Sequence, residues 1–202
     1  DWSSDVCSSD LAEDNIQVCN ATTAAQYFHL LRRQVYTERK TPLVIFTPKQ
    51  GLRMRQTRSR IEEFTTGSFE EVLDDPFVSD RESVRRIVFC SGKVAWDAMA
   101  ERDKRKAPVA VVRVEQLYPL PLEQLLKVVE SYPNARELVW LQEEPENMGA
   151  WKFIESRVWR IKESGYDLRH VARVESGSPA TGSKTIHDQE QAELMDETFA
   201  GL

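Results

Sequence analysis

The sequence predicts an α/β fold, in which a mostly parallel sheet carries helices on both faces. Mostly apolar runs, typical of strands buried on both sides, occur at residues 86–90, 109–114 and 137–141. Segments with apolar side chains at helical spacing lie between them, at 93–105 and 122–131. Parallel strands need such crossover helices to return the chain to the same edge, so the alternation predicts a parallel sheet.

A smaller strand–helix–strand unit precedes this series. Residues 15–19 alternate polar and apolar side chains, as a half-buried strand does, and residues 42–47 form an apolar run that we expect to be buried on both faces. Between them, residues 20–23 offer side chains that cap helices. The helix that follows has one apolar face, which we expect to be the buried one, formed by Ala24, Tyr27, Phe28, Leu31 and Val35.

Residues 49–83, between the two series, are predicted to be a connector. A basic run opens it and either holds phosphate or an acidic partner or is simply solvated. Its basic residues are Lys49, Arg53, Arg55, Arg58 and Arg60. We expect a short helical turn at 69–73, ended by the Asp-Asp-Pro sequence at 74–76.

The C-terminal part continues the alternation of strands and helices. We expect a helix from Gly149 to about Lys162, a short strand at 168–171, and a last helix at 186–199. The first of these helices should bury Phe153, Ile154, Val158 and Ile161. Core or interface anchors are expected at Trp96, Trp140, Trp151 and Trp159.

Residues 1–11 fit neither series. Ser and Asp dominate them, Ser-Ser-Asp occurs twice, and no helical or strand period is present. Such a segment cannot bury a face, so we expect either a short disordered tail or non-native sequence translated from adapter DNA.

Composition limits the classes of function. With 41% hydrophobic and 30% charged residues, the chain has a globular balance, and its net charge of −6 gives no electrostatic reason to bind nucleic acid or an anionic membrane. No apolar run approaches the roughly 20 residues of a membrane helix. Three cysteines, at positions 7, 19 and 90, suggest neither a disulfide framework nor a zinc site, so we expect a reducing cytoplasm.

Five short strings occur in a fixed order along the chain. They are TAAQYFHLLRR at 23–33, VFCSGK at 88–93, VRVEQLYP at 112–119, QEEPENMGAW at 142–151 and SPATG at 178–182. Together they resemble the C-terminal end of the thiamine-dependent decarboxylase component of 2-oxoglutarate dehydrogenase, a transketolase-like family. The resemblance runs from about residue 12 to residue 201.

The resemblance implies a domain organisation. Residues 12–48 would end the thiamine pyrimidine-binding domain as a βαβ remnant, residues 49–83 would connect, and residues 84–202 would form a transketolase-type C-terminal domain. It also implies a homodimer that oxidatively decarboxylates 2-oxoglutarate in the tricarboxylic acid cycle, with thiamine diphosphate and Mg²⁺. The succinyl group would pass to a lipoyl-bearing succinyltransferase partner.

Most of the cofactor site implied by the family is missing from the sequence. No Gly-Asp-Gly motif occurs, and the glutamate that faces the cofactor would lie upstream of Ala12. We therefore expect the chain to be part of a longer enzyme and inactive alone. The alternatives are a standalone transketolase-like interaction domain that docks onto a partner, and an acyl-CoA-binding regulatory domain.

His29 is the candidate catalytic residue. Helical spacing puts it beside Ala25 and Arg33, at the margin of the expected buried face. The resemblance matches it to an active-site histidine that recognises the substrate carboxylate and manages protons, which suits an imidazole. The alternative is a histidine hydrogen-bonded to backbone or water, and for Arg32 and Arg33 we favour a solvated surface position.

Three residues are candidates for an effector site, by resemblance to actinobacterial relatives that bind acetyl-CoA: Thr47, Lys93 and Gln142. Lys93 would stand at a helix N-terminus, which favours anions, although a solvated first-turn position is the simpler expectation. Glu143 and Glu144, at the carboxyl end of a strand, have a weaker claim to function. His170 and His187 are expected to be structural and exposed, respectively.

Overall fold

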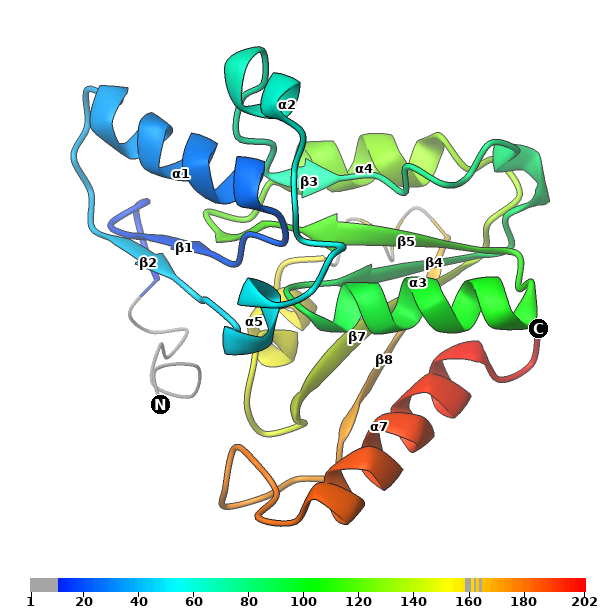
Figure 1. Ribbon diagram of the computed structural model, residues 1–202. Coiled ribbons are helices and arrows are strands. Elements are labelled where there is room, and N and C mark those ends of the chain that lie inside the picture. Colours follow the sequence, from blue (N-terminus) through cyan, green and yellow to red (C-terminus); the bar gives the residue numbers. More distant parts are fainter. Residues whose placement is uncertain (1–10, 159–160, 162, 164) are drawn as a thin grey trace.

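The computed structural model describes residues 11–158, 161, 163 and 165–202, which form two sheets and their helices (Figure 1). The strands are β1 Gln17–Cys19, β2 Leu43–Ile45, β3 Val72–Leu73, β4 Arg86–Cys90, β5 Val109–Val114, β6 Gln116–Tyr118, β7 Glu137–Pro145 and β8 Asp167–Arg173. The helices are α1 Ala24–Tyr36, α2 Ile61–Thr65, α3 Val94–Arg105, α4 Leu122–Glu130, α5 Trp151–Glu155 and α7 Lys184–Phe199. Short 3-10 turns occupy Lys49–Leu52 and Arg81–Ser83.

The larger sheet has the order β3-β5-β4-β7-β8, and every neighbouring pair is parallel except β3 with β5. Because successive side chains of a strand point to opposite faces, each strand contributes side chains to two hydrophobic cores. Ile87 and Phe89 pack with α4 and α5, whereas Val88 and Cys90 pack with α3 and α7. The helices cover both faces (Figure 1), which confirms the predicted fold class.

The smaller sheet has the order β2-β1-β6. β1 is parallel to β2 and antiparallel to β6. Only Glu115 separates β6 from β5, so one stretch of chain supplies a strand to each sheet. The sequence did not predict β6, because three residues that directly follow another strand carry no period of their own.

Three local predictions were wrong. Residues 69–73 form no helical turn, because Val72 and Leu73 pair with the edge of β5 as strand β3. β7 extends to Pro145, so Glu143 and Glu144 lie within the strand. β2 is only partly buried, because within the described chain it is the edge strand of its sheet.

The apolar face of α1 is exposed, which contradicts the prediction that it is buried. Tyr27, Phe28 and Leu31 are 40%, 43% and 42% exposed, and Val35 is 68% exposed. The face turned inward instead consists of Ala25, Gln26, His29 and Leu30.

Polar contacts decide how α1 docks. Gln26 exchanges two hydrogen bonds with the backbone of Glu70, at 2.7 and 3.2 Å. One turn from the end of the helix, Arg33 donates to the side-chain oxygens of Gln17 and Gln116, at 2.7 and 2.6 Å, and pairs with Glu71 at 3.1 Å. An amphipathicity argument counts only apolar residues, so it selected the wrong face.

The end of α7 is held by a buried arginine. Arg86 of β4 donates from Nη1 to the carbonyl oxygen of Thr198 at 2.6 Å and from Nη2 to that of Ala200 at 2.7 Å. Its Nε donates to Glu137 at 2.7 Å. The C-terminal helix is thus tied to the centre of the larger sheet as well as packed on it.

Leu11 is buried, although residues 1–11 were predicted to be a tail that buries nothing. Its side chain is 8% exposed and belongs to the core shared by the two sheets. Residues 1–10, Trp159 and Lys162 lie outside the described residues. Among the helices that the structure describes, none has the length and apolarity needed to cross a membrane.

We predict that the exposed face of α1 makes the chain self-associate, because an apolar face of this size on a helix favours burial against another surface. Replacing Leu31 and Val35 with Gln should shift the chain toward monomer in sedimentation velocity. Ile186→Gln, which removes an apolar side chain exposed on α7, is the matched control and should leave the distribution unchanged. Equal distributions for all three proteins would contradict the prediction.

Candidate functional site

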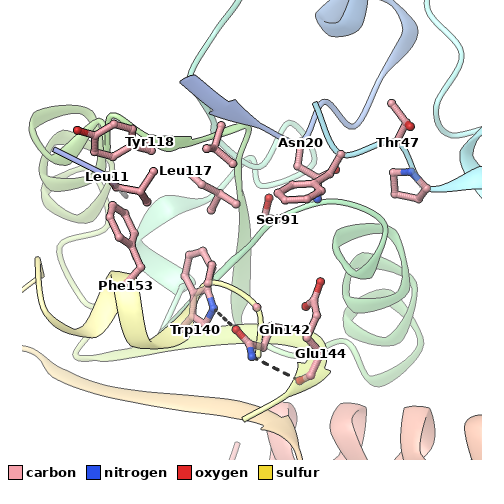
Figure 2. Close-up of a pocket in the computed structure, with 15 residues that line it drawn as sticks. Leu11, Asn20, Thr47, Ser91, Leu117, Tyr118, Trp140, Gln142, Glu144 and Phe153 are labelled. Carbon is pink, nitrogen blue, oxygen red and sulfur yellow. Dashed lines mark hydrogen bonds between the residues drawn. The ribbon is translucent and has the colours of Figure 1, made fainter. Parts of the chain in front are cut away.

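Two neighbouring cavities lie at the carboxyl ends of β1, β2 and β4. The inter-sheet cavity, about 270 Å³, runs between β1 and β6 on one side and β7 and α5 on the other (Figure 2). The loop cavity, about 620 Å³, lies outside it, between the 20–24 segment, the 47–58 segment and the start of α3. Thr47 and Pro48 line both cavities, so together they form one continuous region of the surface.

One end of the inter-sheet cavity is apolar and the other is polar. Phe153, Tyr118 and Leu117 stand at the apolar end, and Asn20, Ser91 and Glu144 line the polar end (Figure 2). Asn20 Oδ1 and Ser91 Oγ are buried atoms without a hydrogen-bond partner within the described structure. Burial, with a smaller contribution from Glu143, raises the pKa of the Glu144 carboxyl above its usual value. The polar end therefore offers hydrogen-bonding groups that the protein leaves unused.

Asn20 and Ser91 were missed by the sequence analysis, although a signal was available. Each follows a parallel strand directly, β1 and β4 respectively, and α/β proteins place functional groups at the carboxyl ends of such strands. Gly92 allows the chain after β4 to lie close to the Asn20 side chain. Its φ of 74° is left-handed, and a Cβ there would collide with the Asn20 amide.

Gln142 lines the inter-sheet cavity, but its amide is used within the protein. Its Oε1 accepts from the Trp151 backbone N–H at 2.9 Å and from Trp140 Nε1 at 3.2 Å. Its Nε2 donates to the Met148 carbonyl at 2.8 Å. These bonds close the turn between β7 and α5, so Gln142 shapes the wall and has little capacity left for a ligand.

Lys93 lines the loop cavity, at the start of α3. Its side chain is 14% exposed and its ammonium contacts Asp97 at 2.8 Å and Glu143 at 2.5 Å, so the expectation of a solvated first-turn residue was wrong. Burial acts to lower its pKa, but the two carboxylates outweigh burial and raise it. The charge is present but already neutralised.

Free positive charge in the loop cavity comes from the basic run. Lys49 and Arg58 both line it, and within the described residues neither forms a salt bridge or a side-chain hydrogen bond. The three predicted effector residues are therefore divided. Thr47 lines the loop cavity together with Lys93 and the inter-sheet cavity together with Gln142, and neither of these two cavities holds all three.

His29 lies apart from both cavities, under α2. Its side chain is 3% exposed, and its Nε2 lies 2.7 Å from the carbonyl oxygen of Glu63. A carbonyl can only accept, so Nε2 carries a proton and donates it. Nδ1 is buried and has no partner among the described residues. A neutral His29 thus keeps a free lone pair on Nδ1, directed away from the Glu63 carbonyl.

The arginines beside His29 differ from each other. Arg32 is exposed, as expected. Arg33 does not have the solvated position that we expected, because its guanidinium lies 4.4 Å over the Phe69 ring and bonds to β1 and β6, two of the three strands of the smaller sheet.

The remaining histidines belong to the larger sheet and α7. His170 stacks on Trp151 with ring centroids 4.5 Å apart, and its Nε2 is 3.3 Å from Glu146. His187 is only partly exposed and its Nδ1 lies 3.1 Å from Arg173 Nη2. Neither side chain lines the inter-sheet cavity or the loop cavity.

Comparison with known proteins identifies the family. The 2-oxoglutarate dehydrogenase C-terminal family matches residues 58–199, and the transketolase pyrimidine-binding domain matches residues 11–55. The chain belongs to the 2-oxoglutarate dehydrogenase C-terminal family. The resemblance stated on the five sequence strings is thereby confirmed.

Similar proteins are named 2-oxoglutarate dehydrogenase E1 component. The one from an Exiguobacterium species is 42% identical over 195 residues, which is 93% of this chain and 20% of the relative. Those from Cupriavidus necator and Coxiella burnetii are 42% and 37% identical, over 95% and 93% of this chain and 20% of each relative. The chain thus spans about a fifth of the length of the curated relatives it matches.

The family implies thiamine diphosphate as cofactor. The residues of this chain do not fit the diphosphate end of such a site. The described residues contain no group of three His, Cys, Asp or Glu side chains that could hold a metal ion, and the sequence contains no Gly-Asp-Gly. His29, whose buried Nδ1 has no partner among the described residues, lines neither of the two cavities.

We predict that Gly67→Ala destabilises the His29 site. A Cβ at position 67 would lie 2.8 Å from the Glu63 carbonyl oxygen and 2.9 Å from His29 Nε2, so α2 or the imidazole must move. Overpacking of this kind costs about 1–3 kcal/mol. Urea unfolding should show the loss, and Gly177→Ala, at a position with open space, should show none.

Proposed function

We propose that the chain is the C-terminal part of the thiamine-dependent decarboxylating subunit of a cytoplasmic 2-oxoglutarate dehydrogenase complex. The observation that carries the proposal is that this chain matches a pyrimidine-binding domain at 11–55 and the C-terminal family at 58–199. The relatives that it matches are about five times as long. We propose residues 12–48 as the end of the first domain, residues 49–83 as the connector and residues 84–202 as the second domain.

The reaction proposed for the whole enzyme is oxidative decarboxylation of 2-oxoglutarate. A homodimer would carry it out with thiamine diphosphate and Mg²⁺, and would pass the succinyl group to a lipoyl-bearing succinyltransferase. The cofactor supplies the carbanion chemistry when bound. The exposed apolar face of α1 supports the proposal, because a helix face of this kind is usually covered in a larger assembly.

In this proposal His29 acts through Nδ1. The Glu63 carbonyl fixes the proton of a neutral imidazole on Nε2, which leaves Nδ1 free to accept a hydrogen bond or a proton from a substrate group. When Nδ1 is protonated, the imidazolium can pair with a substrate carboxylate. Gly67 and Phe28 hold the ring plane, since Gly67 leaves room for it and Phe28 meets it edge-on, with centroids 5.1 Å apart.

A chimera tests the function. The last fifth of the Cupriavidus necator relative is replaced with residues 11–202 of this chain, and 2-oxoglutarate decarboxylation is measured. We expect activity in the chimera and none in this chain alone. His29→Ala in the chimera should lower kcat by about 100-fold or more, which is the usual contribution of a general acid–base group.

The matched control for the chimera is His187→Ala, which removes an imidazole far from α1 and should leave kcat unchanged. A chimera that is folded and binds thiamine diphosphate, yet does not decarboxylate 2-oxoglutarate, would contradict the proposed function. Full activity in the His29→Ala chimera would contradict only the role of His29.

The loop cavity favours a second role, as an acyl-CoA effector site. It brings together Thr47 and Lys93, and it adds the unpaired charges of Lys49 and Arg58. Phosphate groups would meet these side chains and the N-terminus of α3. The inter-sheet cavity, which continues from it at Thr47, offers apolar walls to an acyl end, with Gln142 among the lining residues.

Calorimetric titration with acetyl-CoA tests the effector site. Arg58→Gln removes a charge-assisted contact, so it should weaken binding by about ten-fold. Arg136→Gln removes an exposed guanidinium outside both cavities and should leave the affinity unchanged. No heat of binding in the active chimera would rule out the site.

A further inference from the structure

Glu115 is a fully buried carboxylate at the point where β5 ends and β6 begins. It takes no part in the proposed chemistry, and it lines neither cavity. Both of its oxygens face Thr22. Oε2 accepts the Thr22 backbone N–H at 2.8 Å, and Oε1 accepts the Thr22 hydroxyl at 2.5 Å. Because a buried carboxylate needs hydrogen-bond partners, these two bonds fix Thr22 in position.

Two further contacts hold the same segment. Arg113 Nη1 donates to Thr22 Oγ1 at 3.0 Å, so the hydroxyl bridges the carboxylate and the guanidinium. The Asn20 backbone N–H donates to the Glu115 carbonyl oxygen at 2.8 Å. The loop Asn20–Thr23 is thus held at its main chain and at a side chain by residues of the β5–β6 crossing.

This loop forms the wall between the two cavities. Asn20 lines the inter-sheet cavity, whereas Thr22 and Thr23 line the loop cavity. Thr23 also begins α1, since its hydroxyl accepts the backbone N–H of Gln26 at 3.3 Å. A shift of the loop would therefore change the shape of both cavities and the start of the helix that carries His29.

We propose that Glu115 is a positioning residue, which holds the Asn20–Thr23 loop through Thr22 and so sets the wall of both cavities and the start of α1. What this does for His29 or for an effector rests on the proposed function. The contact between Glu115 and the loop does not depend on the proposed function, and its effect on amide exchange can be measured on the chain alone.

The charge of Glu115 links this hold to pH. Burial raises its pKa from 4.5 to about 7, although Thr22 and Arg113 act in the opposite direction. The Gln26 side chain also lowers this pKa by hydrogen bonding, and the thiols of Cys19 on β1 and Cys90 on β4 interact with Glu115 electrostatically. Burial raises the pKa of Cys19 to about 12 and also raises the pKa of Cys90, so of the two thiols and Glu115 only Glu115 titrates near neutrality.

The sign of the effect follows from linkage. A carboxyl whose pKa is raised in the closed loop binds its proton more tightly there than in an opened, hydrated loop. Its contribution is therefore fully present below the ordinary pKa of 4.5 and is lost as the pH rises to about 7. Amide protection in the loop, corrected for intrinsic exchange rates, should fall over this range.

Hydrogen exchange on the full 202-residue chain tests the proposal. Thr22→Val removes the hydroxyl and should speed exchange of the amides from Thr22 to Gln26 by about ten-fold, the usual effect of one buried hydrogen bond. Thr22→Ser keeps the hydroxyl and should restore slow exchange. The amides of β4 should be unchanged in both variants, because the effect is local.

Glu115→Gln separates the proposed role from a purely structural one, because a purely structural role would not change the pH dependence of amide exchange in the loop. It keeps the size of the side chain but cannot titrate, so loop protection should lose its pH dependence between about pH 5 and 8. Equal exchange in Thr22→Val and Thr22→Ser, or a pH dependence that persists in Glu115→Gln, would overturn the proposal. If a variant fails to fold, the pH series on the unchanged chain still decides, since flat protection would count against it. An inactive chimera with these exchange results would count against the proposed function alone.

Discussion

The crossing of the chain at Glu115 is the constraint on which the rest of the structure depends. A single residue separates β5, an interior strand of the larger sheet, from β6, the strand that pairs with β1. Because β5 lies between β4 and β3, the position of β6 is fixed, and β1 pairs with β6 antiparallel, with a register irregularity between Val18 and Cys19. The two cavities exist where these sheets diverge, so their walls are set by the same crossing.

Polar contacts, rather than the burial of apolar area, determine which face of α1 packs against the sheets. The helix turns Gln26, His29 and Arg33 inward and leaves its aromatic residues outside. In isolation this arrangement would be costly, because the buried groups need partners. Gln26 and Arg33 find them on three separate segments, whereas the buried Nδ1 of His29 has no partner among the described residues. An exposed apolar helix face of this kind is typical of a surface that packs against another protein surface.

The sequence predicted the larger sheet well because its strands are long, apolar and separated by clear helical periods, as at 86–90 and 109–114. The sequence did not predict β3 and β6, because these strands form by pairing with their neighbours and have too few residues to show an alternating pattern of their own. Of the predicted site residues, Thr47, Lys93 and Gln142 line the two cavities, whereas His29 lies apart from both, and the shape of the cavities was not predicted. The contact between Lys93 and Asp97 follows i,i+4 helical spacing. The contacts of Lys93 with Glu143 and of Gln142 with Met148 depend on tertiary folding, which no spacing rule gives.

The grip of Arg86 on the last carbonyl groups of α7 limits how the gene can be shortened. A stop codon placed before Ala200 would delete an acceptor of this guanidinium and leave a buried cation short of partners. Gly201 and Leu202 are exposed and follow that clamp. Affinity tags and fused reporters therefore belong after Leu202, where their attachment point is anchored to the middle strands of the larger sheet.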